Sequence, residues 1–325
     1  MNSSVRILVG VDGSPGCEAA LRWALREAAM WSAATDGAGG GAAPTVTALL
    51  AWTADGLPTG VLRAAAQANH DGLTRAATEM LERTIGRVGE PSAPVTLRRA
   101  VVRDDPVTAL IAAAADADLV VVGDRGHGPI HRMTAGSVSQ GVVHHAPVPV
   151  VVARPPKDGE TPRSDDRRPV AVGIDGSDLS LAALRWAAHA AAVRGVPLRV
   201  VHAWGGYDPM YAEVLVGAQG SLVRQAEDIL AQAVKLGLDD APRLTVDSVV
   251  SPDSAMRALL REAREAQLLV VGSRGHGGFS RLLLGSVSHQ CVLHADCDVA
   301  VVRSDRLPVS ADEPTESTGA AVASA

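Results

Sequence analysis

The chain contains one glycine pattern twice. Residues 123–137 read GDRGHGPIHRMTAGS and residues 272–286 read GSRGHGGFSRLLLGS, so each copy has Gly, two residues, Gly, nine residues and Gly-Ser. Each copy follows an aliphatic run, at 119–122 and at 268–271. A strand that opens into a glycine-rich turn and then a helix presents backbone N–H groups suited to phosphate. The sequence therefore predicts two strand–turn–helix units of one kind.

The duplication extends beyond the glycine pattern. Residues 6–14 read RILVGVDGS and residues 169–177 read PVAVGIDGS, and each is followed by the word ALRWA, at 20–24 and 183–187. The first half is longer, and most of the difference fits the insert TDGAGGGAAP at 35–44, which reads as a flexible loop. The chain therefore consists of one domain that is repeated.

A length of 325 residues suits two domains of about 150 residues each. We expect the first domain over 1–154 and the second over 169–304. The segment 155–168 is rich in proline and charge and is expected to be the linker. The tail 305–325 is polar and rich in small residues, and is expected to be disordered.

Short β-branched runs alternate with Ala- and Leu-rich helical stretches in both halves. This alternation is typical of an open, mostly parallel α/β sheet with helices on both faces. We expect five strands per half, in the order 3-2-1-4-5, and ligands at the carboxyl ends of strands 1 and 4, where the winding reverses. In the first half the expected strands are 5–11, 45–51, 95–101, 118–123 and 148–153.

Composition excludes several classes of partner. Aromatic residues make up 2% of the chain and the formal net charge is −6, which argues against stacking on nucleic-acid bases and against a duplex-binding surface. No apolar run reaches the roughly 18 residues of a membrane span, and the N-terminus lacks a secretory signal. Cys17, Cys291 and Cys297 are an odd count without metal-ligand spacing. We therefore expect a cytoplasmic protein without nucleic-acid or membrane partners.

The glycine motif predicts an anion site in each half. Gly123 and Gly126 let the backbone approach an anion and permit positive φ. Gly136-Ser137 and Gly285-Ser286 each stand where a new helix begins, so the serine hydroxyl either caps the helix or binds a phosphate oxygen. The alternative is a tight turn followed by an ordinary N-cap.

Other polar residues near the motifs have two interpretations each. Asp12 and Asp175 follow the first strand of each half and either accept hydrogen bonds from a base amine or ribose hydroxyl, or cap the next helix. The arginines beside the loops either neutralise phosphates or are solvated surface residues: Arg125, Arg132, Arg274 and Arg281. The histidines without a metal-ligand partner are expected to be exposed loop residues or structural: His127, His144, His145, His276 and His294. Trp23 and Trp186 are expected to pack in the core or between domains.

With these motifs the chain resembles the tandem-domain universal stress proteins common in actinobacteria, from residue 5 to about 304. The resemblance implies two Rossmann-like, adenine-nucleotide α-hydrolase-like domains, and its Gly-x2-Gly-x9-Gly-Ser motif implies the ATP-binding branch. It implies that Asp12 and Asp175 meet adenine, with the backbone of Leu49 and Val201, and that the glycine loops hold ribose and phosphates. The full set of candidate nucleotide-binding residues is Gly10, Asp12, Leu49, Gly123, Asp124, Arg125, Gly126, His127, Gly128, Arg132, Gly136, Ser137, Val138, Gly173, Asp175, Val201, Gly272, Ser273, Arg274, Gly275, His276, Gly277, Gly278, Arg281, Gly285, Ser286 and Val287.

We expect an ATP-binding regulatory protein of the stress response that takes ATP with Mg²⁺ or Mn²⁺, as a homodimer with a regulatory protein partner. The sequence lacks a G-x-x-x-x-G-K-[ST] loop, a G-x-G-x-x-G after the first strand and a G-x-S-x-G elbow. It also lacks an evident base–nucleophile pair or Mg²⁺ carboxylate cluster. Two alternatives stay open: a slow ATP hydrolase or transferase, and a scaffold in which the glycines only form turns.

Two further expectations concern the relation between the halves. The apolar last strands, 148–153 and 298–303, are sheet edges that invite pairing with each other. Where the second loop has Ser273, the first has Asp124, an acid inside the expected phosphate loop. If Asp124 faces the phosphates, its charge repels them and the second site binds nucleotide more tightly. Two alternatives stay open: a bound divalent cation turns Asp124 into a metal contact and reverses the sign of its effect, or Asp124 faces solvent and changes little.

Overall fold

A computed structural model describes the chain over nine ranges of residues. These are 4–36, 42–53, 70–91, 94–124, 136–156, 166–205, 212–238, 244–275 and 284–303. The expected disordered tail, most of the expected linker and the middle of both glycine loops lie outside these ranges.

Strands and helices alternate in each half, as the sequence pattern predicts. The elements of the first half are β1 (Arg6–Gly10), α1 (Pro15–Asp36), β2 (Thr45–Trp52), α3 (His70–Val88), β3 (Thr96–Arg103), α4 (Pro106–Ala114), β4 (Leu119–Gly123), α5 (Ser137–His145) and β5 (Val150–Ala153). Those of the second half are β6 (Val170–Ile174), α6 (Asp178–Arg194), β7 (Leu198–Ala203), α7 (Ala212–Leu238), β8 (Val246–Ser251), α8 (Ala255–Glu265), β9 (Leu268–Gly272), α9 (Ser286–His294) and β10 (Asp298–Val302).

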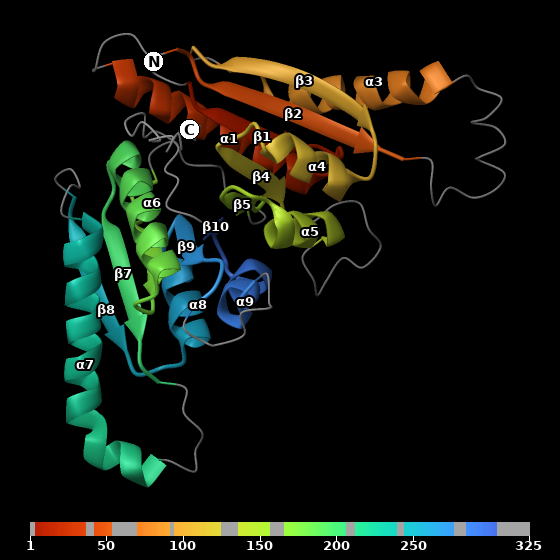
Figure 1. Cartoon of the computed structure of the whole chain (residues 1–325). Helices are drawn as coiled ribbons and strands as arrows, with labels where there is room; N and C mark the ends of the chain where they lie inside the picture. The colour runs from red at the N-terminus through yellow and green to blue at the C-terminus, as the bar shows by residue number, and fades with distance from the viewer. Residues whose placement is uncertain are drawn as a thin grey trace, which may run out of the picture.

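The strands form one ten-stranded sheet in the order β3-β2-β1-β4-β5-β10-β9-β6-β7-β8 (Figure 1). Each half contributes five parallel strands in the predicted order 3-2-1-4-5. The predicted pairing of the last strands is confirmed: β5 and β10 run antiparallel, with Val150 opposite Val301 and Val152 opposite Val299. The two expected sheets are therefore continuous.

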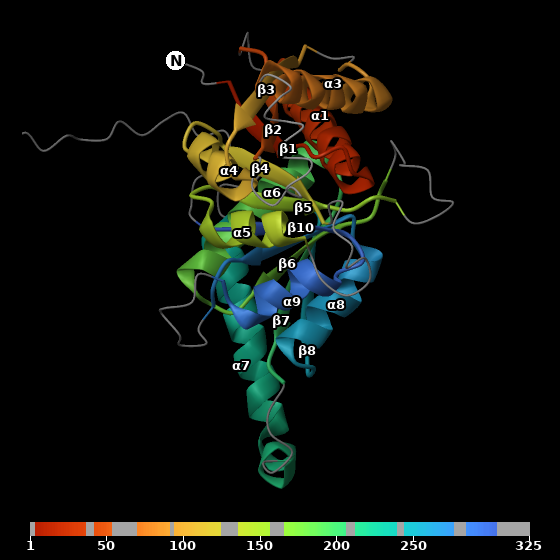
Figure 2. The same cartoon turned by 90° about the vertical axis from the view of Figure 1, so that its right-hand side faces the viewer.

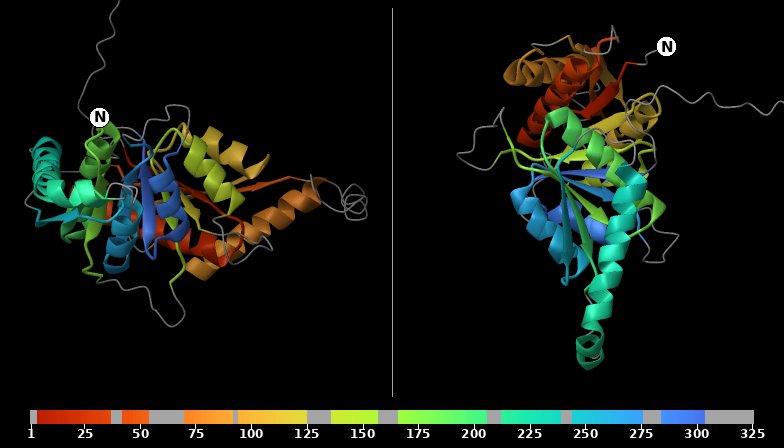
Figure 3. Two further views of the ribbon diagram at one scale, coloured as in Figure 1. Left: turned by 90° about the horizontal axis from the view of Figure 1, so that it is seen from below. Right: turned by 90° about the vertical axis from the view of Figure 1, so that its left-hand side faces the viewer.

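Helices cover both faces of this sheet (Figure 3). One face packs against α1, α3, α6 and α7, and the other packs against α4, α5, α8 and α9. Along a buried strand, alternate side chains enter the two cores, so strands such as β4 and β9 are apolar on both faces. No helix in the described ranges has the length and hydropathy needed to cross a membrane.

The two halves meet through a buried polar cluster between α1 and α6. The Arg194 guanidinium donates to both carboxylate oxygens of Glu27, with Nη1 3.1 Å from Oε1, and it lies over the ring of Trp23 at 5.7 Å. The side chains of Arg194 and Glu27 are 6% and 1% exposed. The rings of Trp31 and His189 meet edge to face at 5.9 Å across the same junction. Trp23 therefore packs between the domains, which is one of its two predicted roles.

Asp298 makes the stability of this junction depend on pH. Its Oδ1 accepts a 2.8 Å hydrogen bond from the Arg154 backbone N–H. Burial raises the pKa of Asp298 to about 6, against the opposing effects of that N–H and of nearby arginine charges. The folded chain then holds a proton that the unfolded chain releases, between pH about 4 and about 6. The free energy of unfolding should therefore fall as pH rises through this window.

We expect Asp298→Asn to remove about 1–3 kcal/mol of that fall, because asparagine keeps an acceptor for the Arg154 N–H but does not titrate. Urea unfolding of wild type and variant at pH 4.5 and pH 7 measures the difference. Ser248→Ala, at an exposed position on β8 without a titratable group, is the control and should leave the pH dependence unchanged. Parallel pH profiles for wild type and Asp298→Asn would contradict the assignment.

Candidate functional site

A cavity of about 300 Å³ lies at the carboxyl ends of β1 and β4, where the winding of the first half reverses. This volume is at the lower end of the range found for small-molecule pockets, about 300–1,000 Å³. Seven of the predicted residues line it: Gly10, Asp12, Leu49, Gly123, Gly136, Ser137 and Val138. Segments that are far apart in the sequence therefore meet at the position predicted for a ligand.

Gly123 is required by packing rather than by its backbone angle. A Cβ at this position would lie 2.5 Å from the carbonyl carbon of Gly16, at the start of α1. Gly272 has the same relation to Leu179 in the second half, with a Cβ 3.0 Å from the Leu179 oxygen. Gly123 does not adopt the positive φ that glycine permits. In the described residues, positive φ occurs instead at Gly13 and Gly176, among others.

The turn after the first strand is built in the same way in both halves. Oδ1 of Asp12 accepts hydrogen bonds from the N–H and hydroxyl of Ser14, at 3.0 and 2.6 Å. Asp175 holds Ser177 at the same distances. Ser177, not Asp175, is the N-cap of α6. Ser14 has the same place before α1, where its Oγ accepts a 3.2 Å hydrogen bond from Cys17 N–H. The N-cap interpretation of the two aspartates was therefore wrong. Each aspartate uses one oxygen to fix the turn beside the site.

The N-terminus of α5 lines the cavity. Its N-cap is Gly136, which makes no side-chain capping bond, and Ser137 is the first helical residue. Ser137 is inside the first turn rather than at the N-cap position, so its hydroxyl does not cap α5, which was one of its two predicted roles. Gly285 and Ser286 stand in the same way at α9. The first-turn amides lack intrahelical acceptors and favour an anion.

In the second half, Asp175 lies directly against the glycine loop. A Cβ added to Gly275 would be 2.0 Å from Oδ2 of Asp175. The chain after β9 is held by two backbone hydrogen bonds, from Ser273 N–H to the Val302 oxygen and from Gly285 N–H to the Ser273 oxygen, both 2.7 Å. The structure therefore brings Asp175, Gly275 and the start of α9 to one end of the sheet. Four other predicted residues of this half are described: Gly173 and Val201 lie on β6 and β7, Val287 lies in the first turn of α9, and Arg274 is exposed beside Gly275.

Asp124 and Ser273 occupy equivalent buried positions, 6% and 2% exposed. The alternative in which Asp124 faces solvent is therefore wrong. Its N–H donates to the Ala153 oxygen and its backbone oxygen accepts from Gly136 N–H at the start of α5, both at 2.9 Å. Asp124 is also not among the residues that line the cavity. The tighter binding expected of the second site stays a prediction.

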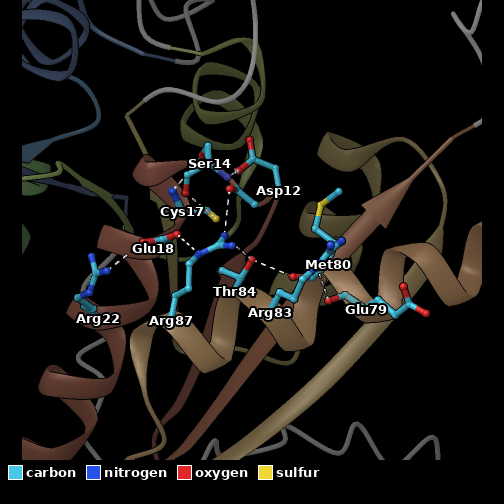
Figure 4. Close-up of polar contacts among 11 residues, drawn as sticks. Asp12, Ser14, Cys17, Glu18, Arg22, Glu79, Met80, Arg83, Thr84 and Arg87 are labelled. Atoms are coloured by element: carbon cyan, nitrogen blue, oxygen red, sulfur yellow. Dashed lines mark hydrogen bonds and ion pairs between the residues drawn. The ribbon is translucent and has the colours of Figure 1, made fainter.

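Arg87 of α3 ties the Asp12 turn to α1 (Figure 4). Its Nε donates to Oε1 of Glu18 at 2.6 Å, and its Nη2 lies 3.4 Å from the Gly13 oxygen. Glu18 in turn accepts from Arg22 at 3.0 Å. The position equivalent to Glu18 in the second half is Leu181, so this ionic tether belongs to the first site alone. The two turns are alike in shape and differ in what anchors them.

Cys17 is the thiol of the cavity and is chemically quiet. Burial raises the pKa of Cys17 to about 11, and its Sγ donates to the Ser14 oxygen at 3.1 Å. The thiol therefore stays protonated at neutral pH and is not a nucleophile. Among the described lining residues of this cavity there is no histidine, lysine or arginine. The three cysteines are free and buried.

Sequence reasoning missed part of the cavity wall. Pro106 and Leu110 of α4, Ala51 of β2, and Ser14 and Cys17 at the start of α1 all line it. The Asp105-Pro106 pair signals a helix start, and Asp105 does accept from the N–H groups of the first turn of α4. The position of α4 beside β1 depends on how the chain crosses over the sheet, which no local sequence signal predicts. Several predicted residues lie outside the described ranges: Arg125, Gly126, His127, Gly128, Arg132, His276, Gly277, Gly278 and Arg281.

The fold and this site define the class of protein: a twice-repeated α/β chain with a cavity at the switch point of its first half and the same turn and helix start in its second half. Its sequence matches the model of the universal stress protein family over residues 5–154 and 166–303. The chain belongs to the universal stress protein family, which confirms the resemblance seen in the sequence.

One relative and one solved structure match nearly the whole chain, and a further solved structure matches less than half of it. A universal stress protein of Mycobacterium tuberculosis (strain H37Rv) is 34% identical over 304 residues, covering 93% of this chain and 97% of that protein. The crystal structure of a universal stress protein from Archaeoglobus fulgidus covers 92% of this chain and 98% of its own, with 19% identity and a TM-score of 0.58. A universal stress protein solved in complex with cAMP is 30% identical and covers 42% of this chain and 97% of its own, with a TM-score of 0.29.

Proposed function

We propose that each half of the chain binds one adenine nucleotide, with ATP as the ligand, and that the protein is regulatory rather than catalytic. The observation that carries this proposal is the first-half cavity, in which the uncapped N-terminus of α5 and the Asp12 turn face one space. Open helix amides suit phosphates, and a carboxylate oxygen beside them suits a base amine or a ribose hydroxyl. The repetition of the same turn and helix start in the second half supports a second site.

The lining chemistry favours binding over turnover. The lining carboxylate, Asp12, is held in its turn by Ser14, and the thiol of Cys17 is protonated. Hydrolysis of ATP needs a group that orients water and cations that stabilise the leaving phosphate. The described residues contain no cluster of three or more metal-ligating side chains, so Mg²⁺ or Mn²⁺ would be held mainly by the phosphates and water. A slow hydrolase is the second candidate.

Calorimetric titration of the full chain with ATP and Mg²⁺ tests the proposal, and we expect two ATP per chain. Ser137→Asp should remove the first site and Ser286→Asp the second. Aspartate is favourable in the first turn of a helix, but it repels a phosphate there by about 4 kcal/mol at about 4 Å and an effective dielectric of about 20. Each variant should therefore stay folded and bind one ATP.

The matched controls are Ser137→Ala and Ser286→Ala, which remove the hydroxyl and leave the backbone amides. We expect them to weaken ATP binding by only about tenfold or less. A wild type that binds no ATP, or a Ser137→Asp/Ser286→Asp double variant that still binds two, would refute the nucleotide sites.

A further inference from the structure

Two arginines cross from one half of the chain to the other at equivalent places. Arg154 directly follows β5, and its side chain reaches the C-terminus of α9: Nε donates to the Ala295 oxygen at 2.8 Å and Nη2 donates to the Val292 oxygen at 2.7 Å. Arg303 directly follows β10, and its Nη2 donates to the Val143 oxygen in the last turn of α5. Each arginine therefore caps a helix of the opposite half.

The antiparallel junction explains why the arginines cross. β5 begins shortly after α5 ends, and β10 runs the other way, so the end of β10 lies beside the start of β5. Arg303 is thereby delivered to the C-terminus of α5, and Arg154 is delivered to α9 by the same geometry. Figure 2 shows α5 and α9 close together on one side of the junction.

The contacts are of a kind that fixes a helix. The last carbonyls of a helix have no intrahelical donor, and a cation there interacts favourably with the helix dipole. Burial and the nearby charge of Arg274 lower the pKa of Arg303. An arginine keeps its charge nonetheless. The charged guanidinium of Arg303 is therefore available to the Val143 oxygen at the end of α5.

The capped helices are the ones whose other ends form the proposed sites. α5 has nine residues and is about 13 Å long, with Gly136 and Ser137 at the cavity and Val143 under Arg303. We propose that Arg303 and Arg154 are positioning residues for nucleotide binding, each acting on the site of the half to which it does not belong. This inference rests on the proposed function and adds that neither site is complete without the other half.

The test uses full chains with a single active site. Ser286→Asp leaves the first site and Ser137→Asp leaves the second. In the first background we expect Arg303→Met to weaken ATP binding about fivefold, equivalent to about 1 kcal/mol for a cation at a helix C-terminus, and Arg154→Met to have little effect. In the second background we expect the reverse, with a larger effect because Arg154 makes two bonds. Arg264→Met is the control: its side chain is 72% exposed and it contacts Asp296 just past α9 from within the same half.

A second readout needs no nucleotide. Hydrogen exchange should speed up at α5 in Arg303→Met and at α9 in Arg154→Met, and Arg→Lys variants should retain part of the protection. Crossed effects in both readouts support the proposal. If the wild type binds ATP, three results for the arginine variants would overturn the proposal: each variant affects the site of its own half, each affects both sites equally, or neither affects a site. If the wild type binds no ATP but hydrogen exchange speeds up at α5 in Arg303→Met and at α9 in Arg154→Met, the nucleotide sites are refuted and the crossed capping is retained.

Discussion

Replacing Arg194 by methionine is expected to lower the free energy of unfolding by about 3–5 kcal/mol, because it leaves the Glu27 carboxylate buried without its bidentate partner. Burial already raises the pKa of Glu27, and Arg194 is the largest influence that opposes the rise. Without Arg194 the carboxylate takes a proton or draws in water. The loss should be greatest near neutral pH and should narrow as pH falls and Glu27 is protonated.

Urea unfolding measures this loss, and two variants sharpen it. The double variant Glu27→Leu/Arg194→Met should recover most of the stability, since replacing a buried ion pair by apolar groups is often neutral. Arg22→Met removes one of the two arginine partners of Glu18, in an ion pair within one helix, and should cost about 0.5 kcal/mol or less. If Arg194→Met costs no more than Arg22→Met, the cluster does not hold the halves together.

Gly275→Glu is expected to abolish ATP binding at the second site and leave the first intact. Any Cβ at this position would lie 2.0 Å from Oδ2 of Asp175, whose Oδ1 is held by Ser177, so the carboxylate must leave its place. Glutamate adds a negative charge beside a carboxylate and near the expected phosphates. The number of ATP bound per chain should therefore fall from two to one in calorimetric titration.

Two glycine variants separate bulk from charge. Gly275→Ala should weaken the second site by displacing Asp175, but less than glutamate does. Gly86→Glu makes the same change in α3, where a Cβ would meet nothing within 4 Å, and should leave both sites unaffected. Two sites of unchanged affinity in Gly275→Glu would show that the loop does not approach the nucleotide.

The sequence predicted the strand order, the pairing of the last strands and the meeting of Asp12 with Gly123, because each follows from a local pattern and the topology of parallel sheets. It did not predict that Glu27 is buried, since a charged residue on a helix ordinarily faces solvent. Nor did it reveal the tether from Arg87 to Glu18 or the crossing of Arg154 and Arg303. These contacts depend on the distances between elements far apart in the sequence, which residue patterns do not encode.

The two halves are related by an approximate twofold axis through the antiparallel pair β5–β10, but the contacts across this axis are not symmetric. In the second half, Ala190 stands where the first has Glu27; in the first, Trp31 stands where the second has Arg194. Two identical subunits would repeat every contact on both sides of the axis, so a buried ion pair of this kind would occur twice or not at all. One covalent chain is free of that obligation. A difference such as Asp124 against Ser273 is then confined to one half, and the two proposed nucleotide sites are free to differ in affinity.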